Sequence, residues 1–425
     1  MSSYLVGQKQ YPLSAAISDV PASLSSSGLP RPISCQKQLV SIASTSASQQ
    51  SGGLVSFSLP TGVGNNSYLV NNSVYYRCTI TPNLAGNTTA IAGFQLNSQS
   101  AAAIINRITI QIGSQTINQI NSYHLLHEML LSHGTNRNYF EQDSLILQYT
   151  ACPNSVGNGS VGTPKTVNSV DVCIPLIVPL FNNSKSLPLF LLNAPINVQI
   201  DLNQTKDVFF TSLDFSSGYT VSNSQLVYDT LQISAEYANA VRSEMMKGAL
   251  YQICLNDYST MTTQSVAAFN YMIGSNYSSL RGVLYTQVPS TTVTGTQTLM
   301  QINGQTNARL YLDGRQINNF DLGTDSQIYC EFQRAMGNMF DSSITTFLGP
   351  ESVAPLTARG YYGSRVFCGG ISTNRVSDYM AMTGSPCQNI NLVINSSGGN
   401  FNFYIVLLID QIMTIDAMGQ VTLIK

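Results

Sequence analysis

Residues 108–118 read Ile-Thr-Ile-Gln-Ile-Gly-Ser-Gln-Thr-Ile-Asn, and residues 308–318 read Ala-Arg-Leu-Tyr-Leu-Asp-Gly-Arg-Gln-Ile-Asn. In each stretch apolar and polar residues alternate up to a two-residue turn that contains glycine, after which a second strand begins. Such alternation is typical of a half-buried strand. A repeat at so long a period, in strand-rich sequence, predicts two copies of one β-domain rather than a solenoid of short units.

The turns and the segments after them support the repeat. Residues 113–114 (Gly-Ser) suit a type II′ hairpin turn, and residues 313–314 (Asp-Gly) suit type I′. A helix is expected after each hairpin, capped by Ser122 in the first copy and by Asp325 in the second. The expected apolar positions and stops are Leu125, Leu126, Met129 and Leu130 before Gly134, and Ile328, Phe332 and Met336 before Gly337.

Period-two alternation extends through the rest of the chain from about residue 35, which favours antiparallel strands with one buried face. In the first half the apolar series are Val55, Phe57 and Leu59; Val74, Tyr76, Cys78 and Ile80; Ile196, Val198, Ile200 and Leu202; and Leu231, Ile233, Ala235 and Tyr237. In the second half they are Ile253 and Leu255; Leu310 and Leu312; Ile390, Leu392 and Ile394; Phe401, Phe403, Ile405, Leu407 and Ile409; and Val421 and Leu423.

The chain has 425 residues, enough for two domains of ordinary size. We expect an N-terminal arm at 1–34, a first β-domain at 35–245 and a second at 246–425. Charged residues make up 9% of the chain, against about 25% in an ordinary soluble protein. Because interface cores are depleted in charge, this composition indicates a surface that neighbours cover. The net charge of -2 and the lack of a basic tail argue against a nucleic-acid-binding footprint.

The eight cysteines form no CxxC pair, and several lie within apolar strand patterns. The start of the chain has no apolar stretch long enough for a signal peptide. We therefore expect reduced, mostly buried thiols in a protein made inside a cell. The most apolar run, 403–413, is too short for a membrane span and is interrupted by Asp410.

No constellation predicts catalytic, cofactor-binding or metal-binding residues, and no cofactor is expected. His124, His127 and His133 could hold zinc, but no local pattern completes a site beyond Glu128, so surface or interface histidines on the helix are the preferred interpretation. The sequence has no GxSxG, P-loop or HExxH motif. Asp410 and Asp416 could act as an acid–base pair, although we expect strand-end or turn residues.

Other features are expected to be structural. The sequons, such as 71–73 and 87–89, are interpreted as unmodified, and the Gly52-Gly53 and Gly398-Gly399 pairs as turns. Tyr361-Tyr362 could stack against a sugar, but the base of a packed loop is preferred.

Three longer segments carry a resemblance to a known family. Residues 172–203 contain Val-Cys-Ile-Pro-Leu-Ile-Val-Pro-Leu-Phe, then Leu-Pro-Leu-Phe-Leu-Leu-Asn, then an alternating strand. Residues 231–246 combine an aliphatic and tyrosine strand with a charged linker, and residues 108–131 give a strand followed by a helix. Together these segments resemble the double jelly-roll major capsid proteins of double-stranded DNA viruses, in particular those of polinton-like viruses, virophages and nucleocytoplasmic large DNA viruses.

The resemblance implies an all-β fold of two tandem eight-stranded antiparallel jelly rolls, with short inserted helices and the N-terminal arm. It also implies a structural protein of the virion rather than an enzyme. Homotrimers would form pseudo-hexameric capsomers that tile an icosahedral shell around double-stranded DNA, assembled inside the host cell. Neighbouring capsomers, penton and minor or cement proteins, and an internal membrane are the implied partners, without sequence-specific contact to the genome.

Two other classes of protein remain open from the residues alone. A carbohydrate-binding β-sandwich protein, such as a lectin, adhesin or fibre, would share the strand pattern and the low charge. A tandem-sandwich hydrolase is the least favoured class, because fold does not decide function and no catalytic set is visible.

Overall fold

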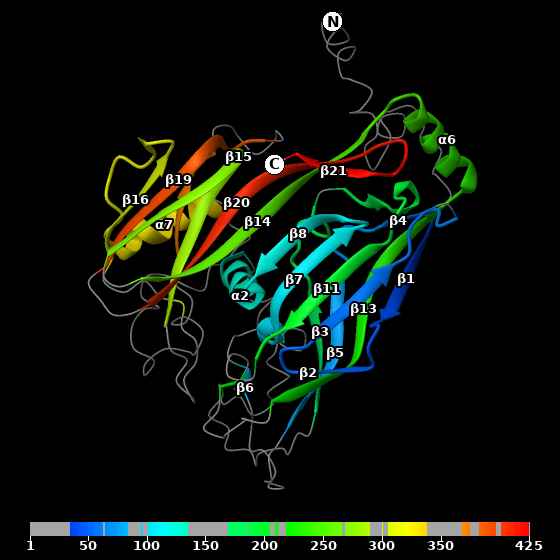
Figure 1. The fold of residues 1–425 in the computed structure, drawn as a ribbon, viewed down its shortest axis with the longest axis horizontal. Coiled ribbons are helices and arrows are strands. Elements are labelled where there is room, and N and C mark those ends of the chain that lie inside the picture. Colours follow the sequence, from blue (N-terminus) through cyan, green and yellow to red (C-terminus); the bar gives the residue numbers. More distant parts are fainter. Residues whose placement is uncertain are drawn as a thin grey trace, which may run out of the picture.

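The computed structural model describes most of the chain from residue 35 onward (Figure 1). The described residues are 35–62, 64–83, 95–96, 101–134, 169–183, 185–204, 209–210, 218–265, 268–289, 300, 305–337, 368–374, 382–396 and 401–424. The expected arm at 1–34, Cys152, the sequon at 87–89, Gly398-Gly399 and Tyr361-Tyr362 lie outside them.

Strands dominate both halves of the described chain. The first half contains β1 (Cys35–Ala43), β2 (Ser48–Gln50), β3 (Leu54–Leu59), β4 (Ser67–Leu69), β5 (Tyr75–Pro82), β6 (Gln95–Leu96), β7 (Ile105–Ile112), β8 (Gln115–Asn121), β9 (Val170–Pro175), β10 (Leu187–Pro188), β11 (Ile196–Leu202), β12 (Phe209–Phe210) and β13 (Tyr219–Ile233). The second half contains β14 (Tyr251–Ser265), β15 (Ala268–Pro289), β16 (Gln305–Leu312), β17 (Arg315–Gln316), β18 (Gly369–Ser372), β19 (Ser385–Ser396), β20 (Phe401–Ile415) and β21 (Val421–Ile424). The helices are η3 (Ala101–Ile104), α2 (Tyr123–Gly134), η4 (Leu189–Leu191), α6 (Ala235–Met246) and α7 (Asp325–Met336).

The first half forms an antiparallel sandwich with jelly-roll strand order. One row runs β1-β13-β5-β9, with β2, β4 and β10 attached to it, and the other runs β3-β11-β7-β8. Strands that are neighbours in a row are far apart in sequence, as expected where Greek-key connections cross between two sheets.

The second half repeats this order within one continuous sheet. The first part of β15 pairs with β19, and its second part pairs with β20 and β18. The register shifts between Gly274 and Gly282, where the strand leaves one row for the other. The two rows are therefore β14-β20-β15-β18 and β15-β19-β16-β17, which match the first half strand for strand. The prediction of two tandem jelly rolls is confirmed.

The repeated hairpin has the predicted turn chemistry in both copies. Gly113 has φ +60°, as position one of a type II′ turn requires. Asp313 and Gly314 have φ +49° and +80°, the pair of positive values that defines type I′. Ile112 pairs with Gln115 across the first turn.

The predicted helices are present; Ser122 directly precedes the first, as expected, and the cap of the second differs by one residue. The backbone carbonyl of Ser122 accepts from Leu125 N at 3.0 Å at the start of α2. For α7 the cap is Thr324, one residue before the expected Asp325, and its hydroxyl accepts from Gln327 N. Gly337 ends α7 in the left-handed conformation, as predicted.

The strand expected at 231–237 is too long. β13 ends at Ile233, and Ser234 caps α6 by accepting from Tyr237 N at 3.3 Å. Ala238 and Met245 then face the protein from one side of the helix. The charged linker between the two rolls is therefore helical.

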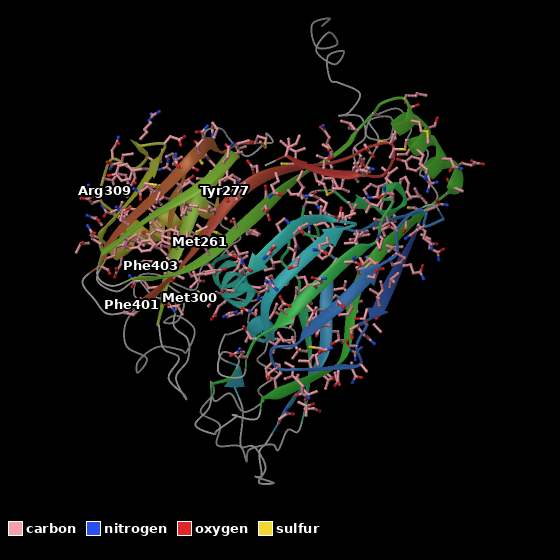
Figure 2. The ribbon with its side chains drawn as sticks, viewed as in Figure 1. Met261, Tyr277, Met300, Arg309, Phe401 and Phe403 are labelled. Atoms are coloured by element: carbon pink, nitrogen blue, oxygen red, sulfur yellow. The ribbon has the colours of Figure 1, made fainter. Side chains whose placement is uncertain are left out.

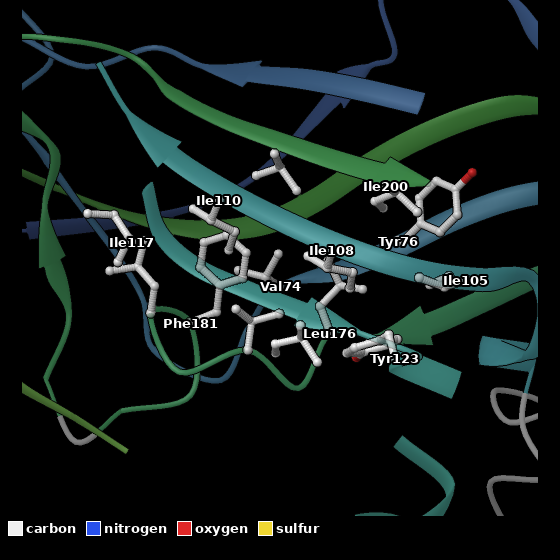
Figure 3. Packing of buried hydrophobic residues seen from close by; sticks show 14 of the residues in the cluster. Val74, Tyr76, Ile105, Ile108, Ile110, Ile117, Tyr123, Leu176, Phe181 and Ile200 are labelled. Atoms are coloured by element: carbon white, nitrogen blue, oxygen red, sulfur yellow. The ribbon is translucent and has the colours of Figure 1, made fainter. Parts of the chain in front are cut away.

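Alternation builds the core of the first jelly roll (Figure 3). Val198 of β11 lies between Phe57 of β3 and Ile110 of β7, and all three are buried. Burial of one such side chain stabilises the fold by about 1.5–3 kcal/mol. On the facing sheet Tyr76 packs edge-on against Phe57 at a ring distance of 5.9 Å.

The second jelly roll has an aromatic core of its own (Figure 2). Phe403 of β20 stacks on Phe269 of β15 with ring centroids 4.4 Å apart. Met261 and Tyr277 are partly buried against this cluster. No helix in the described part of the chain is long and apolar enough to cross a membrane.

Candidate functional site: the junction between the two jelly rolls

The two jelly rolls meet side by side, with β8 and α2 of the first roll against β14 and β20 of the second (Figure 1). Apolar side chains are continuous across this boundary. Tyr251 and Leu255 of β14, with Tyr404 and Met413 of β20, belong to the same buried cluster as the core of the first roll. The junction is therefore built like a domain interior rather than like a flexible linker.

A buried carboxylate lies in the middle of the junction. Asp257 Oδ1 accepts from Asn118 Nδ2 at 2.9 Å, and its Oδ2 accepts from Gln411 Nε2 at 2.5 Å. Asn118 Oδ1 in turn accepts from Leu180 N at 3.3 Å. Asp257 is 7% exposed, and the two amide side chains are 1% exposed. A carboxylate removed from water in this way needs such donors, because each unpaired buried polar group costs free energy.

Side chains also satisfy the backbone at the edge of β8. Asn121 N donates to Thr260 Oγ1 at 2.9 Å, and the same hydroxyl donates to Asn121 O at 2.8 Å. Tyr404 OH donates to Ser122 O at 3.4 Å. A single threonine therefore serves both polar groups of a residue at an edge strand, which would otherwise be open to another strand.

The hairpin between β20 and β21 reaches back to the first roll. Asn193 Nδ2 donates to Met418 O at 3.0 Å, and Asn193 N donates to Gly419 O at 3.3 Å. Asp416 holds the turn by accepting from Met418 N and Gln420 N at 2.9 and 2.8 Å. Tyr251 OH donates to Ser186 O at 3.2 Å nearby. These contacts connect the end of the chain with the segment around η4.

The structure places Asp410 and Asp416 in different surroundings. Asp416 is the predicted turn residue. Asp410, expected at a strand end, lies within β20 at 3% exposure and accepts from Ser279 Oγ at 2.7 Å and Thr383 N at 2.9 Å. Arg281 Nε is 3.7 Å from it. Asp416 follows Asp410 by six residue steps, of which all but the last lie within β20, so about 20 Å of extended chain separates them, too far for a carboxylate pair.

His124 and His127 of α2 are not at the surface, contrary to the expectation, and the side chain of His133 lies outside the described part of the chain. His127 is fully buried, and its Nε2 lies 3.2 Å from Pro175 O. Asn203 Nδ2 lies 3.2 Å from Nδ1 of the half-buried His124. Burial lowers the pKa of both imidazoles to about 4. Both rings therefore brace the inside of the first jelly roll.

Cysteine burial is more mixed than predicted. Among the described residues Cys78, Cys368 and Cys387 are buried, Cys173 and Cys254 are partly buried, and Cys35 and Cys330 are exposed, all without a disulfide. No three His, Cys, Asp or Glu side chains gather as a metal site within the described chain. Gly52 has φ +76° and lies in a turn, as expected.

Sequence reasoning missed the junction residues. Asp257 continues the series of alternate residues Tyr251, Ile253 and Leu255 on one face of its strand. Gln411 continues the face of Ile409 in the same way. A polar residue at a position that alternation assigns to the interior is the available signal. The sequence does not identify its partner, because Asn118 is 139 positions away.

No family model and no curated protein matches the sequence. The fold, however, is similar to solved structures over nearly the whole chain. A chain of the PBCV-1 virus capsid has a TM-score of 0.59 at 11% identity, covering 93% of this chain and 98% of that one. The Faustovirus major capsid protein has a TM-score of 0.59 at 8% identity, covering 91% and 92%. A chain of the Sputnik virophage structure has a TM-score of 0.56 at 12% identity, covering 94% and 90%.

Proposed function

We propose that this protein is a viral major capsid protein, a structural subunit of the virion without catalytic activity. Its first jelly roll spans residues 35–245, its second spans 246–425, and residues 1–34 form an arm at the inner side of the shell. Three copies associate as a pseudo-hexameric capsomer. Such capsomers tile an icosahedral shell around a double-stranded DNA genome after assembly inside the host cell.

One observation carries the proposal. Two jelly rolls of the same strand order occupy one chain, and this arrangement covers over nine-tenths of the PBCV-1 capsid chain and of the Faustovirus major capsid protein. A capsid subunit gains from the pair, because three chains then present six similar edges.

The surface chemistry supports the same function. Only 9% of the residues are charged, which suits a block whose sides are covered by neighbouring capsomers, pentons and minor or cement proteins. The net charge of -2 favours contact with an internal membrane or other proteins over direct binding to DNA.

The test is the assembly state of the purified full chain. Mass photometry is expected to show a species at three times the 46.0 kDa of one chain, and negative-stain images should show six-lobed blocks. A glycan array should give no specific binding. A chain that remains monomeric at micromolar concentration and binds a defined glycan would instead support the carbohydrate-binding alternative.

A further inference from the structure

The junction within the chain joins two similar domains through different surfaces. The first roll contributes the side that carries β8 and α2, and the second contributes the side that carries β14 (Figure 1). The two rolls have matching strand orders. In them β8 of the first roll corresponds to β17 of the second, and β1 of the first roll corresponds to β14 of the second. Each roll therefore has both kinds of side, and within the described part of the chain one side of each roll makes no contact with the other roll. Head-to-tail contacts of this type continue from copy to copy and close into a ring where the rotation permits.

The unused side of the second roll contains a groove of about 710 Å³. It lies between the hairpin of β16 and β17, α7, and the segments around β18 and β19. Phe320 lines it and is 49% exposed. The buried side-chain oxygen of Asn374, also in its wall, has no hydrogen-bond partner among the described residues.

This groove corresponds to the place in the first roll that the junction fills. Asn318 lines the groove, and its counterpart in the repeat is Asn118, which contacts Asp257 of the other roll. Asn318 instead bonds to its own strand β16, through Leu310 N at 2.9 Å and Ala308 O at 2.8 Å. The second roll thus has the corresponding cleft, and neither jelly roll's described residues fill it.

The unused side of the first roll is the outer edge of β1. Within the described chain β1 pairs with β13 along one edge, just as β14 pairs with β20. Leu39 of β1 is 63% exposed, and Leu54 of the adjacent β3 is 45% exposed. Lys37 is the one charged residue in the sequence of β1. A nine-residue strand whose outer edge pairs with no described strand, with Leu39 exposed on it and Leu54 exposed nearby, is a strong candidate for protein contact.

We propose that the groove beside Phe320 binds the β1 side of a second copy of this chain. The inference rests on the proposed function and specifies which surfaces join the copies. Three such contacts alternate with three junctions inside the chains, so that six jelly rolls follow one another around a ring. Phe320 and Leu39 form the apolar centre of each contact between copies, in the role that the shared core has within the chain.

The test compares three single substitutions by mass photometry of the full chain. F320D in the groove and L39D on β1 each place a charge at the contact and should raise the concentration for half-assembly by at least about thirty-fold. M272D is the matched control, because Met272 is 67% exposed on β15 and lies outside both surfaces. It should assemble like the wild type. Circular dichroism melting verifies folding, with F320S and L39S replacing any variant that does not fold.

A mixture of F320D and L39D distinguishes head-to-tail contact from a symmetric one. Each variant retains the surface that the other lacks, so the mixture should form a species of two chains that neither variant forms alone. A wild-type trimer that survives both substitutions would overturn this inference and leave the proposed function intact. A wild-type chain that stays monomeric would overturn both.

Discussion

At the scale of single residues, two histidines couple the fold to pH. Burial lowers the pKa of His124 and His127 to about 4, whereas an unfolded chain titrates near 6.5. Between these values the unfolded state binds more protons than the folded state. The stabilisation is therefore complete above pH 6.5 and is lost as the pH falls toward 4.

We expect the free energy of unfolding to fall by up to about 1.4 kcal/mol per pH unit for each histidine in this range. Urea titrations at pH 7, 6, 5 and 4.5 measure the slope. H127Q retains an amide N–H that can reach Pro175 O but does not titrate, so it should show about half of the histidine contribution. Equal slopes for H127Q and the wild type would contradict the assignment.

Residue identity alone predicts part of this picture. The positive φ at Asp313 and Gly314 follows from their place in a two-residue turn, and the prediction is confirmed. The burial of His127 does not follow, because its helix is apolar on most sides and gives no single outward face. Asp257 is detectable as a charge at an interior position, but its donors come from strands that only the fold brings close.

At the scale of elements, the hairpin of β20 and β21 depends on one glycine. Gly419 has φ +74°, and a Cβ there would lie 2.5 Å from Leu191 O and 2.8 Å from Asn193 N. G419A should destabilise the protein by about 2–3 kcal/mol, since backbone strain adds to a clash with rigid backbone.

The matched control is G314A. Gly314 also lies in a hairpin turn with φ +80°, but a Cβ there meets nothing within 4 Å. It should cost only about 1–2 kcal/mol of left-handed strain. Chemical denaturation of the two variants provides the comparison. Equal losses would show that the contact with the first roll contributes nothing.

The elements themselves were largely predictable. Strands with one buried face, such as β11, show the alternation directly. The alternation rule wrongly assigns the start of α6 to a strand, because Ala235 and Tyr237 happen to continue the period of two set by Leu231 and Ile233. The competing signal was Ser234 before a run of helix formers, and that capping preference prevailed.

At the scale of the whole molecule, the continuous core predicts that the two rolls unfold together. Side chains of β14 and β20 complete the interior of the first roll, so unfolding of the second roll opens the core of the first, and unfolding of the first exposes the apolar faces of β14 and β20. Scanning calorimetry should show one endotherm. Two separate endotherms would mean that the junction is a weak contact between independent domains.

D257A should shift that single endotherm to lower temperature without splitting it. The change leaves the amides of Asn118 and Gln411 without their acceptor, at a cost of about 1–3 kcal/mol each. D321A is the control, because Asp321 pairs with Arg309 in the open and its loss should leave the midpoint unchanged.

The repeated hairpin predicts two copies of one β-domain, and the resemblance carried by residues 172–203 predicts that each copy is a jelly roll. The way in which the two jelly rolls contact each other could not be predicted. Asn118 and Asn318 are equivalent residues of the repeat, but Asn118 contacts Asp257 of the other roll, whereas Asn318 bonds to Leu310 of its own roll.

β15 is one unbroken stretch of backbone that enters both rows of the second roll. A single strand therefore joins the two layers at the corner, where the first roll has separate strands β3 and β5 with the short β4 between them. The two sheets of the second roll cannot slide past each other at this corner, because β15 belongs to both of them. We therefore expect the second roll to resist shear between its two layers more strongly than the first roll does.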